Sequence, residues 1–253
     1  MIRWFININT WLCDKIENLL PTKFTRSLLH LHELTAARIM SERPAQMIVD
    51  IGGGHLCPFA EHARNDPDTK VLSVDILHSQ LLNNAVADYR VAADVCQGIP
   101  LANESCDIMV TRSVIEHLND NESFIQDSMR VLKENGYCIH VFPCKFAPFA
   151  IFNQIIPNKI AQRMLNYIFP QWKEEVGFKA YYNKTYYPAF INLLKKSGFK
   201  IEELHIRYYQ SIYYKFFLPL YLIFLVYDLT LWILRIKPLC CQMLIVANKP
   251  PHS

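Results

Sequence analysis

The spacing of apolar residues divides the chain into a regular middle part and a less regular second half. Between residues 46 and 143, runs of three or four apolar residues alternate with stretches of helical spacing. Such alternation is typical of an α/β fold, in which a parallel sheet carries helices on both faces. The five strands predicted in this way cover residues 47–49, 71–74, 90–92, 108–110 and 138–141.

Two helices and two further strands complete the predicted core. Apolar residues from 124 to 132 recur at steps of three and four, and Asn135-Gly136 supplies a left-handed stop. A second helix begins at Pro188 and closes at Ser197-Gly198. The remaining two strands are predicted at residues 200–204 and 243–246.

Residues 46–249 are therefore predicted to form one domain, with two insertions. Residues 144–187 are rich in Phe, Ile and Tyr and are punctuated by prolines, so we expect an inserted lid after the fifth strand. Residues 211–238 form a hydrophobic insertion before the last strand.

The apolar part of that insertion, residues 216–234, has Asp228 as its only strongly polar member. A bilayer-spanning helix needs about 20 residues, but a single crossing would separate two strands that we expect in one sheet. We therefore predict a shallow helix or hairpin, kinked at Pro219 and lying in the membrane interface. The alternatives are a helix buried against the N-terminal helices or in a dimer interface, and a spanning helix beside a truncated soluble fold.

Residues 1–45 are predicted to form amphipathic helices. Trp4, Ile8, Trp11 and Ile16 fall on one face at helical spacing. Polar residues interrupt this apolar run and no small-residue cleavage site follows, so we interpret the segment as a retained helix and not as a signal peptide.

The amino-acid composition limits the kinds of partner that the protein is expected to bind. Half of the residues (51%) are apolar, 13% are aromatic, and the net charge is +3 with basic residues scattered along the chain. This argues against nucleic acid as the partner. The eight cysteines form no C-x-x-C pair and no metal-ligand spacing, which favours reduced thiols in a cytoplasmic protein and no metal site.

The first chemical signal is Asp50-Ile51-Gly52-Gly53-Gly54, directly after a predicted buried strand. Glycines in this position let backbone amides approach a ligand closely. Dinucleotide enzymes use G-x-G-x-x-G, and here Cys57 stands where the third glycine belongs. The carboxylate of Asp50 would attract a cationic amino group and repel a pyrophosphate.

Two more carboxylates follow the next two predicted strands, Asp75 after the second and Asp94 after the third. Asp75 can accept hydrogen bonds from both ribose hydroxyls, and Asp94, with the amide of Val95, can bind an adenine ring. Each alone could be a helix cap, and Asp75 would suit NAD equally well. Together they indicate a ligand that carries an amino group, a ribose and a base.

These residues resemble the class I S-adenosylmethionine (SAM) dependent methyltransferases. The resemblance rests on Asp50-x-Gly52-x-Gly54, Asp75, Ala93-Asp94-Val95, residues 99–108, residues 113–118 (Ser-Val-Ile-Glu-His-Leu) and residues 130–136. The branch that it resembles most includes the ubiquinone and menaquinone methyltransferases. Two positions depart from the family pattern, Leu56 in place of a third glycine and Cys106 in place of an aromatic residue.

The resemblance implies a Rossmann-like sheet whose last strand is antiparallel, with SAM as the cofactor. It implies the following cofactor residues: Asp50, Gly52, Gly53, Gly54, Asp75 with its neighbour Ile76, Asp94, Val95, and Arg112 with Ser113 beneath the sulfonium.

The sequence identifies residues that would bind the methyl acceptor less clearly than those that would bind the cofactor. His117 is the candidate general base, since an imidazole of near-neutral pKa can take a phenol or enol proton, although it could simply pack at a helix start. His140 is of the same type but lies in the middle of a predicted strand. Phe142, Tyr181 and Tyr182 are candidates for lining the acceptor pocket.

The sequence therefore predicts a SAM-dependent methyltransferase acting on a hydrophobic acceptor, a small molecule or lipid drawn from a membrane. We expect a cytoplasmic protein, peripherally attached to the inner face of the membrane. A nucleotide-dependent oxidoreductase and a non-catalytic, membrane-associated protein of the same fold are the alternatives.

Overall fold

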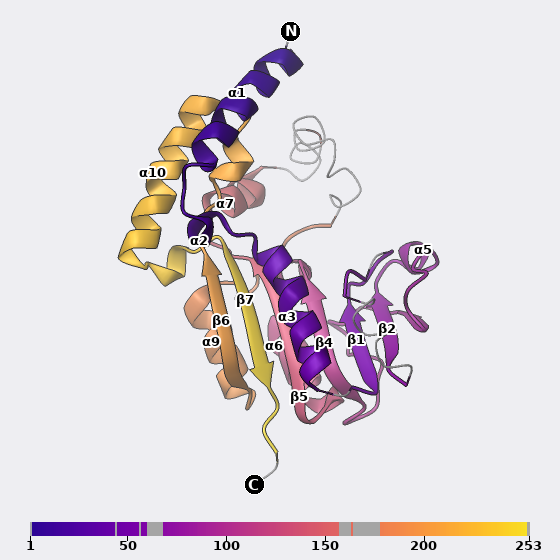
Figure 1. The fold of residues 1–253 in the computed structure, drawn as a ribbon. Coiled ribbons are helices and arrows are strands. Elements are labelled where there is room, and N and C mark those ends of the chain that lie inside the picture. Colours follow the sequence, from indigo (N-terminus) through magenta and orange to yellow (C-terminus); the bar gives the residue numbers. More distant parts are fainter. Residues whose placement is uncertain are drawn as a thin grey trace.

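A computed structural model describes residues 2–43, 45–55, 57–59, 68–156, 163 and 178–251 of the chain. Its centre is a seven-stranded sheet with the order β3-β2-β1-β4-β5-β7-β6 (Figure 1). The strands are β1 (Met47–Ile51), β2 (Lys70–Asp75), β3 (Tyr89–Ala92), β4 (Cys106–Arg112), β5 (Leu132–Pro143), β6 (Lys200–Arg207) and β7 (Gln242–Asn248).

The sheet is parallel from β3 to β5, and β7 runs antiparallel to both of its neighbours. In the register of the antiparallel pair, Ile139 of β5 lies opposite Val246 of β7. The predicted Rossmann-like sheet, mostly parallel with an antiparallel last strand, is confirmed.

Helices cover both faces because successive residues of each strand point to opposite sides. On one face, Ile48 and Val110 pack with the apolar side of α3 (Leu28–Glu42). On the other, Val49 and Met109 share a core with α6 (Asn121–Val131) and α9 (Tyr187–Lys196).

The structure differs from the prediction at two boundaries, the end of the helix before β5 and the start of β5. The helix expected to stop at Asn135-Gly136 ends at Val131, and β5 starts at once with Leu132. Asn135 does adopt the left-handed conformation, with φ of 60°, but within the first residues of β5. The left-handed conformation was therefore predicted correctly, but its place at a helix end was wrong, because such residues also occur within strands.

At one end of the sheet the remaining helices gather: α1 (Ile2–Glu17), α2 (Thr22–Thr25), α7 (Pro148–Ile155) and α10 (Leu218–Leu234) (Figure 1). Within the predicted lid, residues 157–162 and 164–177 lie outside the described part. Short turns of helix complete the fold: α5 (His78–Leu81), η1 (Ile115–His117), η3 (Ser211–Tyr214) and η4 (Lys237–Leu239).

The apolar part of the insertion forms one continuous helix, α10, with the short turns η3 before it and η4 after it. The expected kink at Pro219 is wrong, because this proline lies in the first turn, where its missing N–H has no helical partner to lose. The hairpin alternative is also wrong, because residues 218–234 form a single uninterrupted helix. Among the described residues, no helix has the length and apolar character needed to cross a membrane.

Candidate cofactor and acceptor site

The loop after β1 is built so that only glycine fits. Gly52 and Gly54 have φ of 74° and 43°, in the left-handed region. A Cβ on Gly52 would lie 2.2 Å from a methyl group of Val114, and one on Gly53 would lie 2.3 Å from Ser73 Oγ. The backbone of the loop is therefore packed closely against β2 and the segment after β4.

Asp75 ties this loop to the end of β2. Its Oδ2 accepts a hydrogen bond from Gly54 N (3.1 Å) and its Oδ1 accepts one from Leu77 N (2.8 Å). Asn84, which the sequence analysis did not single out, donates from Nδ2 to Gly54 O (3.1 Å). These bonds hold the loop in place before any ligand arrives.

Asp50 is buried beside Gly53, and its Oδ2 has no hydrogen-bond partner among the described residues. Burial raises the pKa of this carboxyl to about 7, against a hydrogen bond from Cys57. A Cβ on Gly53 would come within 2.6 Å of that same Oδ2. An unsatisfied carboxyl oxygen next to a side-chain-free position fits the amino group of SAM, whose charge would favour the ionised carboxylate.

β3, β2 and β1 are neighbours in the sheet, so the three predicted carboxylates do share one edge. Asp94 is exposed, and its Oδ1 accepts from Cys96 N (3.0 Å) in a turn. Val95 is buried and borders an open pocket of about 390 Å³ against α6. Ile76, next to Asp75, is exposed. We call this edge, with Asp50, Gly52–Gly54 and Asp75, the cofactor edge.

Arg112 and Ser113, which were predicted to lie together beneath the sulfonium, have different surroundings in the structure. Arg112 donates from Nη1 to Glu33 Oε1 of α3 (2.7 Å), so its side chain is engaged on the α3 face. Ser113 is exposed with φ of 54°, and its N–H donates to Val141 O (2.9 Å). Ser113 thus turns the chain from β4 into η1, next to the glycine loop.

Glu116 is a buried carboxyl that the sequence analysis missed. Its side chain is 5% exposed, and Oε2 has no hydrogen-bond partner among the described residues. Burial raises its pKa to about 8, so the group is mostly protonated at neutral pH. The run Ser-Val-Ile-Glu-His-Leu contained the signal, but burial of a glutamate cannot be read from one sequence.

His117 lies at the end of η1 and is partly exposed. Its Nδ1 is 3.1 Å from Lys179 O, so Nδ1 carries the proton and Nε2 is left with a free lone pair. Nε2 lies 3.8 Å from Glu116 Oε1. Burial lowers the pKa of His117, and the hydrogen bond to Lys179 opposes this effect only in part. The lowered pKa favours the neutral imidazole.

The other candidate base, His140, is fully buried and its Nδ1 lies 2.8 Å from Thr111 Oγ1. Burial lowers its pKa to about 3. It has no access to an acceptor, as its place in the middle of a strand had indicated.

The predicted acceptor residues have unequal access. Tyr181 is 45% exposed, whereas Tyr182 is buried, and the N–H groups of both donate to Glu116 O (2.8 and 3.0 Å). Phe142 is fully buried, with its ring centroid 4.6 Å from that of Phe190. Tyr181 and Tyr182 thus join His117 around Glu116, and Phe142 lies in the core beneath.

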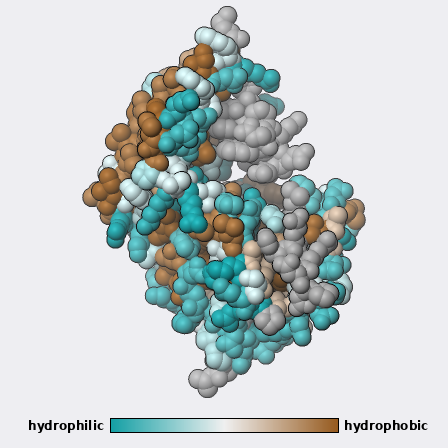
Figure 2. Space-filling model, viewed as in Figure 1, coloured by the Kyte–Doolittle hydropathy of each residue, from teal (hydrophilic) through white to brown (hydrophobic). Residues whose placement is uncertain are grey.

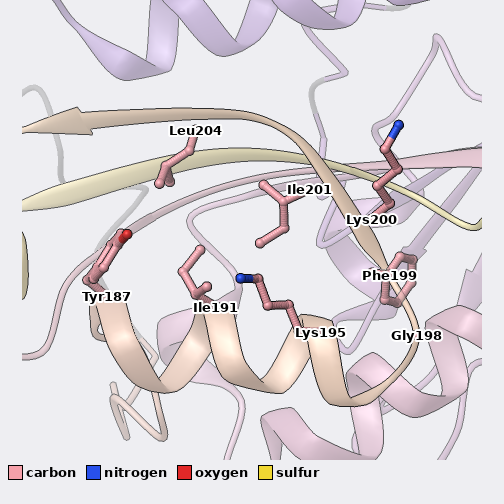
Figure 3. A pocket seen from close by; sticks show the side chains of 8 residues that line it. All are labelled: Tyr187, Ile191, Lys195, Gly198, Phe199, Lys200, Ile201 and Leu204. Carbon is pink, nitrogen blue, oxygen red and sulfur yellow. The ribbon is translucent and has the colours of Figure 1, made fainter.

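A larger open pocket, about 560 Å³, lies at the opposite edge of the sheet between α9 and β6 (Figure 3). Tyr187, Ile191 and Leu204 line it, with Lys195 reaching across. Because β6 is the strand farthest from β3, this pocket is remote from the glycine loop and has no part in the site. The described residues contain no cluster of metal-ligating side chains.

Comparison with known proteins agrees with this geometry. Residues 49–140, which span the glycine loop, Asp75, Asp94 and η1, match the family described as methyltransferase domain. No curated protein sequence matches the chain.

Solved structures share the fold. A SAM-dependent methyltransferase from Methanosarcina mazei is 16% identical with a TM-score of 0.51, over 85% of this chain and 98% of that one. Geranyl diphosphate C-methyltransferase from Streptomyces coelicolor, solved with S-adenosyl-L-homocysteine, is 13% identical with a TM-score of 0.53, over 87% and 82%. The [4+2]-cyclase SpnF is 13% identical with a TM-score of 0.57, over 88% and 81%. At these identities the likeness shows the fold alone.

Proposed function

We propose that this chain, which carries a class I SAM-dependent methyltransferase domain, methylates a hydrophobic acceptor drawn from a membrane. The observation that carries the cofactor half is the unsatisfied Oδ2 of Asp50, beside a glycine backbone and one strand away from Asp75. The geometry and the family match support SAM together.

In this proposal the cofactor edge binds SAM from one end to the other. Asp50 holds the amino group, the amides of Gly52–Gly54 lie along the methionine part, and Asp75 accepts from the ribose hydroxyls. Asp94, Val95 and Ile76 hold the adenine, and Ser113 lies beneath the sulfonium. When bound, SAM supplies a methyl group on a positively charged sulfur, which reacts with a nucleophile placed in line.

His117 is the proposed general base. Its Nδ1–H is engaged with Lys179 O, so Nε2 is the atom that takes a proton from the acceptor. Tyr181 and Tyr182 lie beside it, on the segment that returns from the lid. A neutral imidazole with a fixed tautomer is suited to an acceptor with an acidic hydroxyl or enol.

The hydrophobic nature of the acceptor is supported by the surface of the second half. Large apolar side chains of α10 and α7 are exposed, among them Ile223, Val226 and Ile155. One structural neighbour binds geranyl diphosphate, an isoprenoid. An isoprenoid quinone precursor, a polyprenyl lipid or an acyl lipid fits this pattern, with residues 211–238 at the membrane interface and the catalytic domain on the cytoplasmic side.

Calorimetric titration of the purified protein with SAM tests the first half, and absence of binding overturns it. The second half is tested by incubating the protein with methyl-labelled SAM and total lipid extract, and analysing the products by mass spectrometry. Label in a lipid-soluble product supports the proposal. Label only in water-soluble products, when a matched cytosolic extract is supplied, contradicts the hydrophobic acceptor.

A further inference from the structure

Helices α1 and α10 pack against each other, although some 200 residues separate them. Asn9 Oδ1 accepts a hydrogen bond from Leu218 N (2.8 Å) and so caps the first turn of α10. Lys215 Nζ donates to Asp14 Oδ1 (2.7 Å) and is also paired with Glu17. A small core of Cys13, Phe24, Tyr209, Tyr221 and Leu225 fills the space between them. We call α1, η3 and α10 the helical platform.

The outer side of this platform is apolar. Trp4 and Trp11 of α1 are 68% and 58% exposed, and Ile223 and Ile233 of α10 are 65% and 69% exposed. The exposed positions of α10 are all uncharged. Figure 2 shows apolar side chains covering the region of α1 and α10, while much of the sheet domain is hydrophilic. A surface of this kind marks an interaction site.

The carboxyl group of α10 points into the protein and is hydrogen-bonded there. Asp228, the single Asp, Glu, Lys or Arg of the helix, is fully buried and accepts from Gln210 N, Ser211 N (both 2.8 Å) and Ser211 Oγ (2.5 Å). The one carboxylate of the helix therefore fixes η3 to α10 and contributes nothing to the solubility of the outer face.

Basic residues surround the platform. Residues 2–27 and 211–238 together contain seven basic and three acidic residues, while the whole chain has a net charge of only +3. The three acidic residues are Asp14 and Glu17, both paired with Lys215, and the buried Asp228. Exposed Arg3, Lys15, Lys23 and Arg235 are left to face the surroundings.

We infer that the outer faces of α1 and α10 together form a docking face for a bilayer with anionic headgroups. This inference rests on the proposed function and extends it, because it adds α1 to the membrane contact and names the lipid charge. Exposed tryptophans, an apolar stripe and flanking basic residues are the features of a helix lying in a membrane interface. A second copy of the chain fits less well, since two surfaces with an excess of basic residues repel each other.

The platform is connected to the acceptor site. Gln210, held by Asp228, accepts from Phe149 N at the start of α7 (3.3 Å), and the rings of Phe149 and Tyr213 lie 4.5 Å apart. Tyr182, which bonds to Glu116 O, shares a small core with Ala147 and Ala150 of the same region. Docking of the platform therefore brings the root of the lid to the lipid surface.

Vesicle sedimentation tests the inference on the full chain. The probes are vesicles of phosphatidylcholine alone and of phosphatidylcholine with phosphatidylglycerol. We expect at least tenfold tighter binding to the anionic vesicles, and loss of that preference in high salt. Two double variants, Trp4→Ser/Trp11→Ser and Ile223→Asp/Val226→Asp, should each weaken binding by tenfold or more. Leu34→Asp, at a 48% exposed leucine of α3, is the matched control and should bind normally.

Undiminished binding by the α10 variant overturns the docking face, and undiminished binding by the α1 variant overturns the part given to α1. A concentration-dependent dimer in light scattering that both double variants abolish would assign the face to a second copy. Calorimetry with SAM on the same proteins separates the two proposals. SAM binding without vesicle binding would overturn the docking face and the membrane contact of residues 211–238, but not the SAM-dependent activity. Vesicle binding without SAM binding would overturn the proposed SAM-dependent activity and leave the docking face standing.

Discussion

The cofactor edge and the helical platform solve opposite problems in one chain. The cofactor edge surrounds an inward-facing site, with glycines that admit no side chain and with carboxyl groups held by backbone amides. The platform is filled on the inside and presents its apolar side chains outward. In the functions proposed above, the first arrangement would bind a small polar ligand and the second would bind an extended apolar surface.

A buried aspartate in each region makes the difference concrete. Asp228 accepts four hydrogen bonds from Gln210 and Ser211, and burial nevertheless raises its pKa to about 6. Asp50 keeps one oxygen without a partner among the described residues, and its pKa rises to about 7. A satisfied carboxyl holds the fold together, whereas an unsatisfied one is available to a ligand.

The largest expected effect concerns the pH dependence of stability at Glu116. Its pKa of about 8 lies above the ordinary value of 4.5, so its contribution is fully present below pH 4.5 and is lost as the pH rises through 8. Between pH 5 and pH 9 the wild type should lose on the order of 4 kcal/mol of unfolding free energy that Glu116→Gln does not lose. Urea denaturation at a series of pH values measures this.

The control for that series is internal. Asp50 shifts in the same direction but is present in both proteins, so its effect cancels in the difference. Parallel stability curves for the wild type and Glu116→Gln would show that Glu116 is ionised in the folded protein at neutral pH. Glu116 would then be a buried carboxylate beside the neutral imidazole of His117.

Next in size is the loss of the anchor inside the platform. Asp228→Ala removes the acceptor for two backbone N–H groups and two side chains, which should cost about 3 kcal/mol of unfolding free energy. SAM affinity should stay within twofold, because the cofactor edge does not contact α10. Denaturation and calorimetry on one preparation test this, and a large loss of SAM affinity would show that the two regions are coupled.

Substitutions at the cofactor edge should lower the affinity for SAM. Asp75→Ala removes the proposed ribose contact and the acceptor for Gly54 N, and we expect SAM affinity to fall about a hundredfold. Asp94→Ala, at an exposed carboxylate in a turn, should reduce it less. Titration calorimetry ranks the two variants, and equal affinity for Asp75→Ala and wild type would remove Asp75 from the site.

The sheet and the positions of the carboxylates at its strand ends could be predicted because their signals are local. Short apolar runs predicted the strands, and each carboxylate could be placed from the end of its own strand. What the pattern could not supply was the state of single groups, such as the engagement of Arg112 with Glu33 or the burial of Glu116. Those depend on which element packs opposite, and no local periodicity encodes that.

The platform shows the same limit over a longer distance. The sequence predicted two amphipathic or apolar segments and offered the membrane and the N-terminal helices as alternative partners for residues 216–234. The structure gives α10 one face against α1 and leaves the other face exposed. The bond from Leu218 N to Asn9, which settles the pairing, joins positions with no common sequence pattern.

The smallest expected effect is the one that separates docking from folding. Val226 is 65% exposed on the outer side of α10, so Val226→Asp leaves the packed side of the helix intact. Its unfolding free energy should change by no more than about 0.5 kcal/mol, as at ordinary surface sites, and SAM affinity should not change. Leu225→Asp, one residue away but buried against α1, should destabilise the protein strongly. If both substitutions were equally harmful, α10 would be covered on both sides by protein, and the apolar stripe would belong to the fold instead of to a membrane.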